Sequence, residues 1–554
     1  MRQNRRDFVR GLGAAAGAVT LGSVPASAAA PPEGGYEVQR ADVTVRSFDG
    51  TRIETTIFEP KADGEYPAVM ATHGWGGSRD QNFGEGEDYA SRGYVLLTFD
   101  SRGFGESGGN VGVDGPKEVR DVSALIDHLA DHPKVRTEDP DGEDPVVGMF
   151  GGSYAGGIQL NAAAHDDRLD ALVPEICWHD LNYALQPNGV VKTVWGLGLY
   201  GVGIGGSRQH EAESGDVRGL RQGLDTAVHR GIAEGLALND FSQGTESYFA
   251  VRSPGHQLEA IAETSAPALF IQGWTDHLFV PNQAIWNYEG LRERGLETKL
   301  LFYNEGHEQI PVDGEYTQTV DISDEARRAW LDVHLKRGRV AAKGRKRLRS
   351  LLPDDVTYYS AQDEVNRSAD AIPPSGATTH SVPLGTSETV PGVQGESVVA
   401  NGPATSNSYV LKDSYDGPAT SVDFDIPATE LGASEDGDRI EVLGAPHLDL
   451  NVRPLGDEAF LFFKPYHIRA DGSATHINDL VTPLRVSAGP QGAGQVQQVS
   501  LELLAFHRYL EPGDSLRYTV AGADTGFNFS RQSAGAAVGH DSVLRVPTRP
   551  DPTS

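Results

Sequence analysis

The stretch Val146-Val147-Gly148-Met149-Phe150-Gly151-Gly152-Ser153-Tyr154-Ala155-Gly156-Gly157 decides the fold. It begins as a short apolar run typical of a strand, turns through small residues with Ser153 at the apex, and continues as a buried helix would. A serine at a sharp strand-to-helix turn is the geometry of the nucleophile elbow, whose small neighbours let strand and helix approach closely. The second glycine of the G-x-S-x-G pattern falls one residue late, at Gly156, but Ala155 is still small. The alternative interpretation is an ordinary glycine-rich connection with a bystander serine.

Apolar strand-like runs alternate with helical patterns on both sides of this stretch. The runs cover residues 68–72, 94–99, 268–272 and 299–303. Between the second run and the elbow, apolar residues recur at helical spacing from Val119 to Leu129. This alternation predicts a mostly parallel sheet with helices on both faces and reactive groups beyond the carboxyl ends of its strands. With the serine elbow, it predicts an α/β-hydrolase fold.

Composition divides the chain of 554 residues into further parts. We expect a catalytic domain over residues 31–337, interrupted at about 178–262 by a glycine-rich, helical cap. Residues 338–376, which include the basic run 343–349, are expected to form a linker. From about 377 to 550, short alternating segments separated by Gly, Pro, Asn and Asp predict an antiparallel sandwich of jelly-roll type.

The first thirty residues differ in kind from the rest. Asn4-Arg5-Arg6-Asp7-Phe8-Val9-Arg10 carries paired arginines, a weakly apolar segment follows from Gly11 to Val24, and Ala26-Ser27-Ala28 offers a cleavage site. Residues 1–30 therefore look like a twin-arginine export signal, and we expect a secreted protein without a membrane span. The single cysteine, Cys177, cannot form an internal disulfide.

The formal net charge of −31 limits the partners of the protein. Such a surface repels nucleic acid and anionic membranes. Lysine is scarce beside arginine among the few basic residues, and the imbalance resembles the acid-rich proteins of salt-loving microbes. We therefore expect a salt-adapted protein whose partner is a small molecule.

Two residues downstream of the elbow complete a candidate catalytic set. A serine hydroxyl needs a base to remove its proton, and the base needs an orienting carboxylate. In α/β hydrolases these follow in the order serine, acid, histidine. Asp276 follows the strand-like run 268–272 and His307 follows the run 299–303, so both are placed where the fold would bring them beside Ser153. Alone, Asp276 could cap the next helix and His307 could be a loop histidine.

Other histidines fit the role of the base less well. His277 adjoins the acid, and His73 belongs to the loop expected to bind the oxyanion. His447, His467, His476 and His507 fall in the sandwich half. The tetrahedral intermediate also needs N–H donors, for which we expect the backbone amides of Tyr154 and Trp75.

Several motifs together resemble the X-prolyl dipeptidyl-peptidase and cocaine-esterase family of α/β hydrolases. They are Gly152-Ser153-Tyr154-Ala155-Gly156, Asp100-Ser101-Arg102-Gly103 with Gly105-Glu106-Ser107-Gly108, Gly273-Trp274-Thr275-Asp276, Gly444-Ala445-Pro446 and Pro512-Gly513-Asp514-Ser515-Leu516. The resemblance implies Ser153 as nucleophile, Asp276 as acid, His307 as base, a helical cap and a C-terminal jelly roll. Esterases of this group are similar in using a tyrosine hydroxyl as an oxyanion donor, and this chain has Trp75 there instead.

These residues predict a serine hydrolase that uses no cofactor and no metal, since no H-E-x-x-H or spaced Cys/His set occurs. The substrate stays open between an X-Pro peptide and an ester. A peptidase would bind a free amine, for which Glu211, Glu213 and Asp216 are candidates, whereas Trp178, Trp195, Tyr200 and Phe249 would suit an apolar acyl group. A second hypothesis is a non-catalytic surface protein whose sandwich binds carbohydrate. The sequence does not indicate an oligomeric state.

Overall fold

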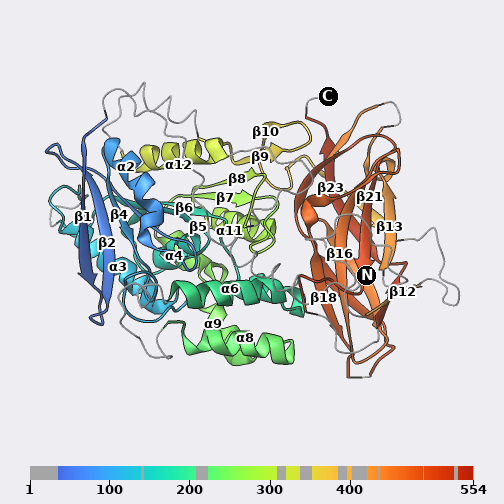
Figure 1. The fold of residues 1–554 in the computed structure, drawn as a ribbon. Coiled ribbons are helices and arrows are strands. Elements are labelled where there is room, and N and C mark those ends of the chain that lie inside the picture. Colours follow the sequence, from blue (N-terminus) through green and yellow to red (C-terminus); the bar gives the residue numbers. More distant parts are fainter. Residues whose placement is uncertain are drawn as a thin grey trace, which may run out of the picture.

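The computed structural model describes most of the chain in two parts, a catalytic domain and a C-terminal sandwich (Figure 1). The described residues are 35–138, 142–207, 223–307, 320–336, 352–384, 396–401, 421–434, 437–490, 492–528 and 535–552. The predicted export signal, the basic run 343–349 and the candidate carboxylates Glu211, Glu213 and Asp216 lie outside these residues.

A mixed sheet of ten described strands forms the frame of the catalytic domain, in the order β1-β2-β4-β3-β5-β6-β7-β8-β9-β10. From β4 to β9 every neighbouring pair is parallel, and the antiparallel β1, β2 and β10 lie at the two edges. The strands are β1 (Val38–Arg46), β2 (Arg52–Pro60), β3 (Ala68–Thr72), β4 (Val95–Phe99), β5 (Val147–Gly152), β6 (Leu169–Glu175), β7 (Ala268–Gly273), β8 (Thr298–Tyr303), β9 (Val356–Ser360) and β10 (Val365–Ala369). The central strands are buried on both faces, which explains their continuous apolar runs.

The expected linker over residues 338–376 was wrong in its described part. β9 pairs in parallel with β8, and β10 returns antiparallel, so this segment extends the catalytic sheet. The five residues of β9 are all buried. Its sequence Val-Thr-Tyr-Tyr-Ser lacks an aliphatic run, and the hydroxyl of Tyr358 donates to Glu441 of the sandwich at 2.5 Å. Val, Thr and Tyr favour strands, so β9 carried a strand signal that the composition of the surrounding segment obscured.

Helices cover both faces of this sheet, and side-chain alternation along each strand explains why. In β5, Met149 packs with one core and Phe150 with the other. The first core includes α3 (Pro116–Ala130), α4 (Tyr154–Ala163), α10 (Leu258–Glu263) and α11 (Pro281–Glu293). The second core includes α2 (Phe83–Ser91) and α12 (Val320–Leu335). The short helix η1 (Arg79–Asn82) precedes α2.

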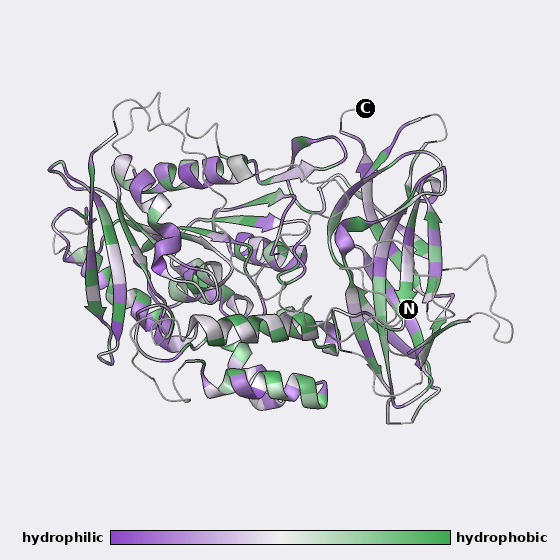
Figure 2. Ribbon diagram, in the orientation of Figure 1, coloured by the Kyte–Doolittle hydropathy of each residue, from purple (hydrophilic) through white to green (hydrophobic). Residues whose placement is uncertain are grey.

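The chain between β6 and β7 leaves the sheet, where the sequence predicted a cap. Its described part is helical. The helices are α5 (Leu181–Leu185), η2 (Pro187–Gly189), α6 (Thr193–Gly206), α8 (Thr226–Leu238), α9 (Gln243–Ala250) and η3 (Pro254–His256), followed by α10. Figure 1 shows α6 and α8 lying side by side along the catalytic domain, with α6 reaching toward the sandwich. Figure 2 shows that α6 is mostly apolar along its length.

The C-terminal half is a sandwich of two antiparallel sheets around one apolar core. One sheet contains β11 (Thr378–Pro383), β12 (Glu396–Ala400), β14 (Ile440–Gly444), β15 (His447–Pro454), β19 (Gln497–Glu502), β20 (Phe506–Leu510), β22 (Gly535–Gly539) and β23 (Val543–Pro550). The other contains β13 (Ser421–Pro427), β16 (Glu458–Ile468), β17 (Ala474–His476), β18 (Thr482–Ser487) and β21 (Ser515–Ala521), and the short helices η4 (Ala428–Leu431) and η5 (Ile477–Asp479) connect strands.

Hydrogen bonds and apolar packing join the sandwich to the catalytic domain beside the predicted acid. Asn282 of α11 donates to Leu503 O at 3.1 Å and accepts from Ala505 N at 2.8 Å. His277 bonds Asn478 O at 2.8 Å. Val280 packs into the sandwich core. The loop that carries Asp276 is thereby held from the sandwich side. No helix in the described part of the chain is long and apolar enough to cross a membrane.

Candidate active site

Ser153 occupies a strained turn between β5 and α4. Its backbone angles are φ 58° and ψ −119°, a combination that L-residues rarely adopt and that is typical of a nucleophile elbow. Gly151 has φ +144°, and a Cβ there would lie 2.6 Å from Ala155 Cβ. This contact requires glycine at 151 opposite Ala155, the residue that stands where the G-x-S-x-G pattern has its second glycine.

The two glycines after the turn are required by the cap. A Cβ at Gly156 would lie 2.7 Å from Cys177 Cβ, and one at Gly157 would lie 2.2 Å from the ring of Trp178. Trp178 is buried and its indole N–H donates to Arg252 O at 2.8 Å. The first turn of α4 thus lies directly against the segment that begins the cap.

Asp276 and His307 meet at the carboxyl ends of β7 and β8. His307 Nδ1 lies 2.6 Å from Asp276 Oδ2. The approach of the two loops depends on glycine, because a Cβ at Gly273 would lie 1.6 Å from Glu305 O and one at Gly306 would lie 2.5 Å from Asp276 Cα. The sequence-predicted acid and base therefore form a close pair.

The carboxylate of Asp276 is buried and fixed on both oxygens. Oδ1 accepts the amides of Leu278 at 3.0 Å and Phe279 at 2.9 Å, while Oδ2 faces His307. An orienting carboxylate held in this way keeps the proton on Nδ1, so that Nε2 can act as the base. His307 Nε2 is buried and has no hydrogen-bond partner within the described residues.

Ser153 and His307 lie near the same aromatic residues but are not hydrogen-bonded to each other. The ring centroid of Phe279 lies 5.1 Å from that of His307, and Phe279 lines the same cavity as Ser153. Trp195 of α6 lies edge-on to the imidazole at 6.1 Å. Catalytic contacts of this kind are often loose before substrate binds.

The loop after β3 lies against the elbow, as an oxyanion loop should. The ring centroids of Trp75 and Tyr154 are 5.2 Å apart, in an edge-to-face arrangement. The Trp75 indole N–H donates to Leu199 O of α6 at 2.7 Å, so the ring faces the cap and its N–H is already engaged. Tyr154 is the first residue of α4, so its amide has no acceptor within that helix.

His73 supports this loop and is not a competing base. Nδ1 donates to Gly74 O at 2.7 Å, and Nε2 accepts the amide of Ser101 at 3.0 Å. Burial lowers the pKa of this imidazole, which keeps it neutral. The other candidate histidines are also committed to structure, for example His467 to Asp514 at 2.7 Å and His507 to Glu441 at 3.0 Å.

The Asp-Ser-Arg-Gly motif after β4 is a scaffold for the same region. Asp100 is fully buried and accepts the amides of Arg79 at 2.6 Å and Glu106 at 2.9 Å. Arg102 lies between Asp49 and Asp121, at 2.9 Å and 2.6 Å. Hydrogen bonding to Arg102 holds the pKa of Asp49 well below its usual range. These charges fasten the hairpin of β1 and β2 to the loops of the site.

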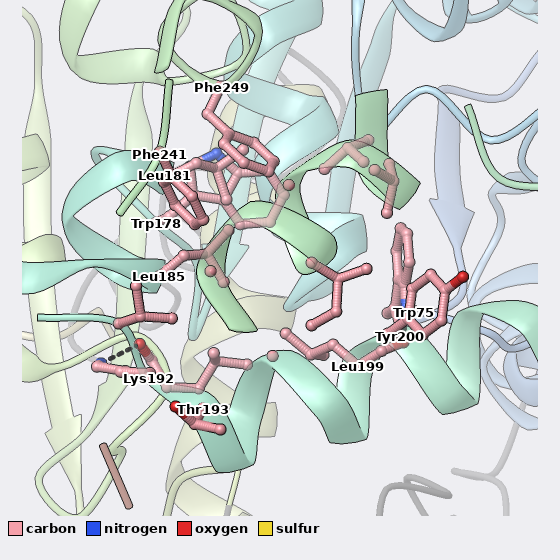
Figure 3. Close-up of a pocket in the computed structure, with 18 of the residues that line it drawn as sticks. Trp75, Trp178, Leu181, Leu185, Lys192, Thr193, Leu199, Tyr200, Phe241 and Phe249 are labelled. Carbon is pink, nitrogen blue, oxygen red and sulfur yellow. Dashed lines mark hydrogen bonds between the residues drawn. The ribbon is translucent and has the colours of Figure 1, made fainter. Parts of the chain in front are cut away.

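Ser153 lines a cavity of about 110 Å³ beneath the cap. Figure 3 shows part of the lining of this cavity. Sequence reasoning found Trp178, Tyr200 and Phe249 among its lining residues, whereas Trp195 contacts His307 instead. It missed the lining aliphatic side chains of the cap, which are Leu181, Leu185, Val191, Leu199, Val228, Ile232 and Leu236. The spacing of Val228, Ile232 and Leu236 along α8 is a helical stripe that the sequence carried but that any packed helix would show.

Two buried acids lie below the elbow, outside the cavity lining. The amide of Asp114 lies 3.2 Å from the hydroxyl of Tyr154, and Glu118 accepts the amide of Gly112. Burial raises the pKa of Asp114 well above its usual value and that of Glu118 to about 7. Burial therefore favours the uncharged form of both carboxyl groups.

Fold and site together define an α/β hydrolase with a helical cap and an antiparallel β-sandwich. Residues 49–309 match the family model of the X-Pro dipeptidyl-peptidases, the S15 family. The match spans β2 to β8 and includes Ser153, Asp276 and His307.

Individual relatives cover smaller shares of the chain. It is 31% identical over 159 residues to the quorum-quenching protein AidA of Acinetobacter baumannii, covering 27% of this chain and 50% of that protein. It is 27% identical over 230 residues to a putative Xaa-Pro dipeptidyl-peptidase of Rhodopirellula baltica, covering 40% of this chain and 36% of that protein. The alignments thus span half or less of these relatives. An aminopeptidase from a marine sediment archaeon of the Thaumarchaeota has the same fold, with a TM-score of 0.67 at 14% identity over 93% of this chain and 97% of that one.

Proposed function

We propose that the protein is a serine hydrolase that cleaves an ester or a peptide bond through an acyl-enzyme. Ser153 is the nucleophile, His307 the base, Asp276 the orienting acid, and the amides of Tyr154 and Trp75 bind the oxyanion. The observation that carries the proposal is that the strained Ser153 lines the same cavity as Phe279. Phe279 also contacts His307, which pairs with Asp276 at 2.6 Å.

The first half-reaction follows from these positions. Ser153 Oγ attacks the substrate carbonyl as its proton passes to His307 Nε2, and the carbonyl electrons move onto the oxygen that faces the two amides. When the tetrahedral intermediate collapses, the C–O or C–N bond breaks and the leaving group takes the proton from Nε2. Asp276 stays ionised and holds the imidazolium through Nδ1.

The second half-reaction reverses these roles with water. His307 removes a proton from a water molecule that attacks the acyl-enzyme, and then returns it to Ser153 Oγ as the acid is released. For both steps His307 Nε2 must come within hydrogen-bond distance of Ser153 Oγ. We propose that substrate binding brings these two atoms together.

Covalent labelling tests the proposal directly. An uncharged fluorophosphonate should label the wild-type protein at Ser153 in high salt, and the adduct can be located by mass spectrometry of the peptide that contains it. Ser153→Ala should lose both the label and the turnover of p-nitrophenyl esters. Ser101→Ala, at a buried serine of the neighbouring loop, is the matched control and should still be labelled. Labelling at another residue, or turnover that survives Ser153→Ala, would remove the basis of the proposal.

We further propose that the protein is exported by the twin-arginine route and works outside the cell in high salt. The paired Arg5 and Arg6, the apolar segment to Val24 and the net charge of −31 support this. Replacing both arginines by lysine should retain the full-length precursor inside the cell. Secretion that is unchanged in this variant would contradict the assignment.

A further inference from the structure

The described residues that line the cavity at Ser153 are almost all apolar. Its described lining consists of aliphatic and aromatic side chains, three glycines, Ser153, Thr193 and Lys192. Figure 3 shows Trp178, Leu181, Phe241 and Phe249 on one side, and Trp75, Leu199 and Tyr200 on the other. The hydroxyl of Tyr200 is used by His229 at 2.8 Å, so its ring contributes mainly apolar surface.

The one charge among the described lining residues is positive. Lys192 is buried, and its ammonium donates to His277 O at 2.7 Å and to Leu278 O at 3.0 Å. A substrate ammonium placed in this cavity would lose its hydration, would meet apolar walls and would face a charge of its own sign. The uncharged acyl chain of an ester meets none of these costs, and each buried methylene is worth about 0.8 kcal/mol.

We propose that the cavity selects an uncharged, apolar acyl group, so that the protein is an esterase for aliphatic or aromatic acids and not an X-Pro dipeptidyl-peptidase. This inference rests on the proposed acyl-enzyme function and names its substrate class. The acyl chain occupies the space between α6, α8 and Trp178, while the leaving group points away from the cap.

Gly196 sets the width of the acyl site. It lines the cavity, and a Cβ there would meet only Ile232 Cδ1, at 3.5 Å, which is ordinary contact. A larger side chain at this position would therefore fit the backbone and fill the space between α6 and α8. Gly198 lies on the same helix outside the lining, and a Cβ there would meet nothing within 4 Å. The two positions form a matched pair for mutation.

The substrate test compares p-nitrophenyl hexanoate with p-nitrophenyl 6-aminohexanoate, which differs only by the terminal ammonium, and with Ala-Pro-p-nitroanilide. We expect kcat/KM to rise about fourfold per methylene from acetate to hexanoate. The 6-amino ester should be at least about 100-fold poorer than hexanoate, because its buried charge finds no anion among the described lining residues. The anilide should not be turned over.

The variant test uses Gly196→Leu and Gly198→Leu. Gly196→Leu should lose turnover of hexanoate and keep that of acetate, whereas Gly198→Leu should show the wild-type preference. Equal losses on both esters would show that Gly196 does not border the acyl chain and would overturn this placement. Turnover of the anilide that is abolished when Glu211, Glu213 and Asp216 are replaced by amides would overturn the substrate class. If fluorophosphonate labels Ser153 in either case, the hydrolase assignment itself stands; if it does not, that assignment fails first.

A second inference concerns Lys192 as a residue of the catalytic apparatus. Its ammonium bonds the carbonyls of His277 and Leu278, and the same two peptide groups present the amides of Leu278 and Phe279 to Asp276 Oδ1. Two short chains of hydrogen bonds thus run from one buried cation, through two peptide groups, to the catalytic carboxylate. Bonds in such chains strengthen one another in a buried setting.

The geometry points to Lys192 as a positioning residue that fixes Asp276 through these peptide groups. Lys192 immediately precedes α6, which carries Trp195 against His307 and lines the acyl site. The cap and the acid–base pair are therefore joined by one side chain. A cap displaced from the domain would release the loop that orients Asp276.

Lys192→Met tests this role, since it keeps an apolar stem and removes the charge. We expect kcat for p-nitrophenyl acetate, whose acyl group is too short to depend on the acyl site, to fall about tenfold or more. The fall should be smaller than the ~10⁴-fold loss that follows removal of the acid itself. Removing a cation also favours the protonated base, so the acidic limb of kcat/KM should move to higher pH. Asp276, His277, Glu305 and His307 are titratable groups of this loop and of the loop that carries the base.

Lys192→Arg separates positioning from packing because it retains the charge. Its pH profile should have the wild-type acidic limb, even if its kcat falls. If Lys192→Met keeps the wild-type kcat and limb, or if both variants move the limb equally, the role of Lys192 is only structural and the inference fails.

Discussion

Gly157→Ala is the substitution whose effect the structure determines most narrowly. The new methyl group would lie 2.2 Å from the ring of Trp178, far inside contact distance. Trp178 is held by its bond to Arg252 O and packs on Phe279 with ring centroids 5.2 Å apart, so it must shift as a block toward the cavity. We expect loss of stability and a narrower acyl site from this one methyl group.

The magnitude follows from two opposing effects. Alanine in place of a helical glycine favours folding by about 1 kcal/mol. Overpacking of a filled core costs about 1–3 kcal/mol. Gly198→Ala has the first effect without the second, because nothing lies within 4 Å of its Cβ. The difference between the two variants therefore isolates the steric cost, about 1–3 kcal/mol.

Urea unfolding at constant high salt, followed by tryptophan fluorescence, measures this difference. Turnover of acetate and hexanoate esters reports the cavity in the same samples. We expect Gly157→Ala to unfold at lower urea than Gly198→Ala and to lose hexanoate turnover selectively. Equal midpoints for the two variants would refute the packing of Trp178 against α4.

Three further predictions follow from other parts of the structure. Asp276→Asn should lower kcat about 10⁴-fold because the amide favours the wrong tautomer of His307. His277→Gln, at the neighbouring residue that is hydrogen-bonded to the sandwich, should leave kcat within about threefold of wild type. Steady-state kinetics distinguishes the two variants. Glu118 has a pKa of about 7 when folded against 4.5 as its ordinary value, so the unfolded chain loses this proton first and stability should fall as pH rises from about 4.5 to 7. Glu118→Gln should remove this loss of unfolding free energy, which is roughly 3 kcal/mol over the whole pH range. An unchanged pH dependence in unfolding titrations would contradict the burial of this acid. The thermal midpoint should rise with KCl because salt screens a net charge of −31, and a midpoint independent of salt would argue against salt adaptation.

The elbow and the order of the three candidate residues can be predicted from the local sequence. Ser153 lies in a turn whose constraints come from residues within four positions, such as Gly151 and Ala155, so the motif is readable. Asp276 and His307 are readable as a pair because each directly follows a strand of a known kind of sheet. The contact that joins them, through Gly273 and Gly306, appears only in three dimensions.

Long-range contacts account for what the sequence did not indicate. β9 favours a strand by its own residues, but only its pairing with β8 and its contact with the sandwich show that it extends the catalytic sheet. Lys192 reads as a surface residue at the start of a helix, yet its partner His277 is 85 residues away. The character of the acyl site likewise depends on which faces of α5, α6, α8 and α9 converge, which helical periodicity cannot tell.

We propose that Ser153, His307 and Asp276 act together as one catalytic set on the substrate carbonyl. A crystal structure of the protein after reaction with a hexylphosphonate ester tests it most directly. We predict phosphorus bonded to Ser153 Oγ, His307 Nε2 within hydrogen-bond distance of that oxygen or of a phosphonyl oxygen, and the alkyl chain between α6 and α8. An adduct on Ser153 with His307 remote from it and still bonded to Asp276 would contradict the claim.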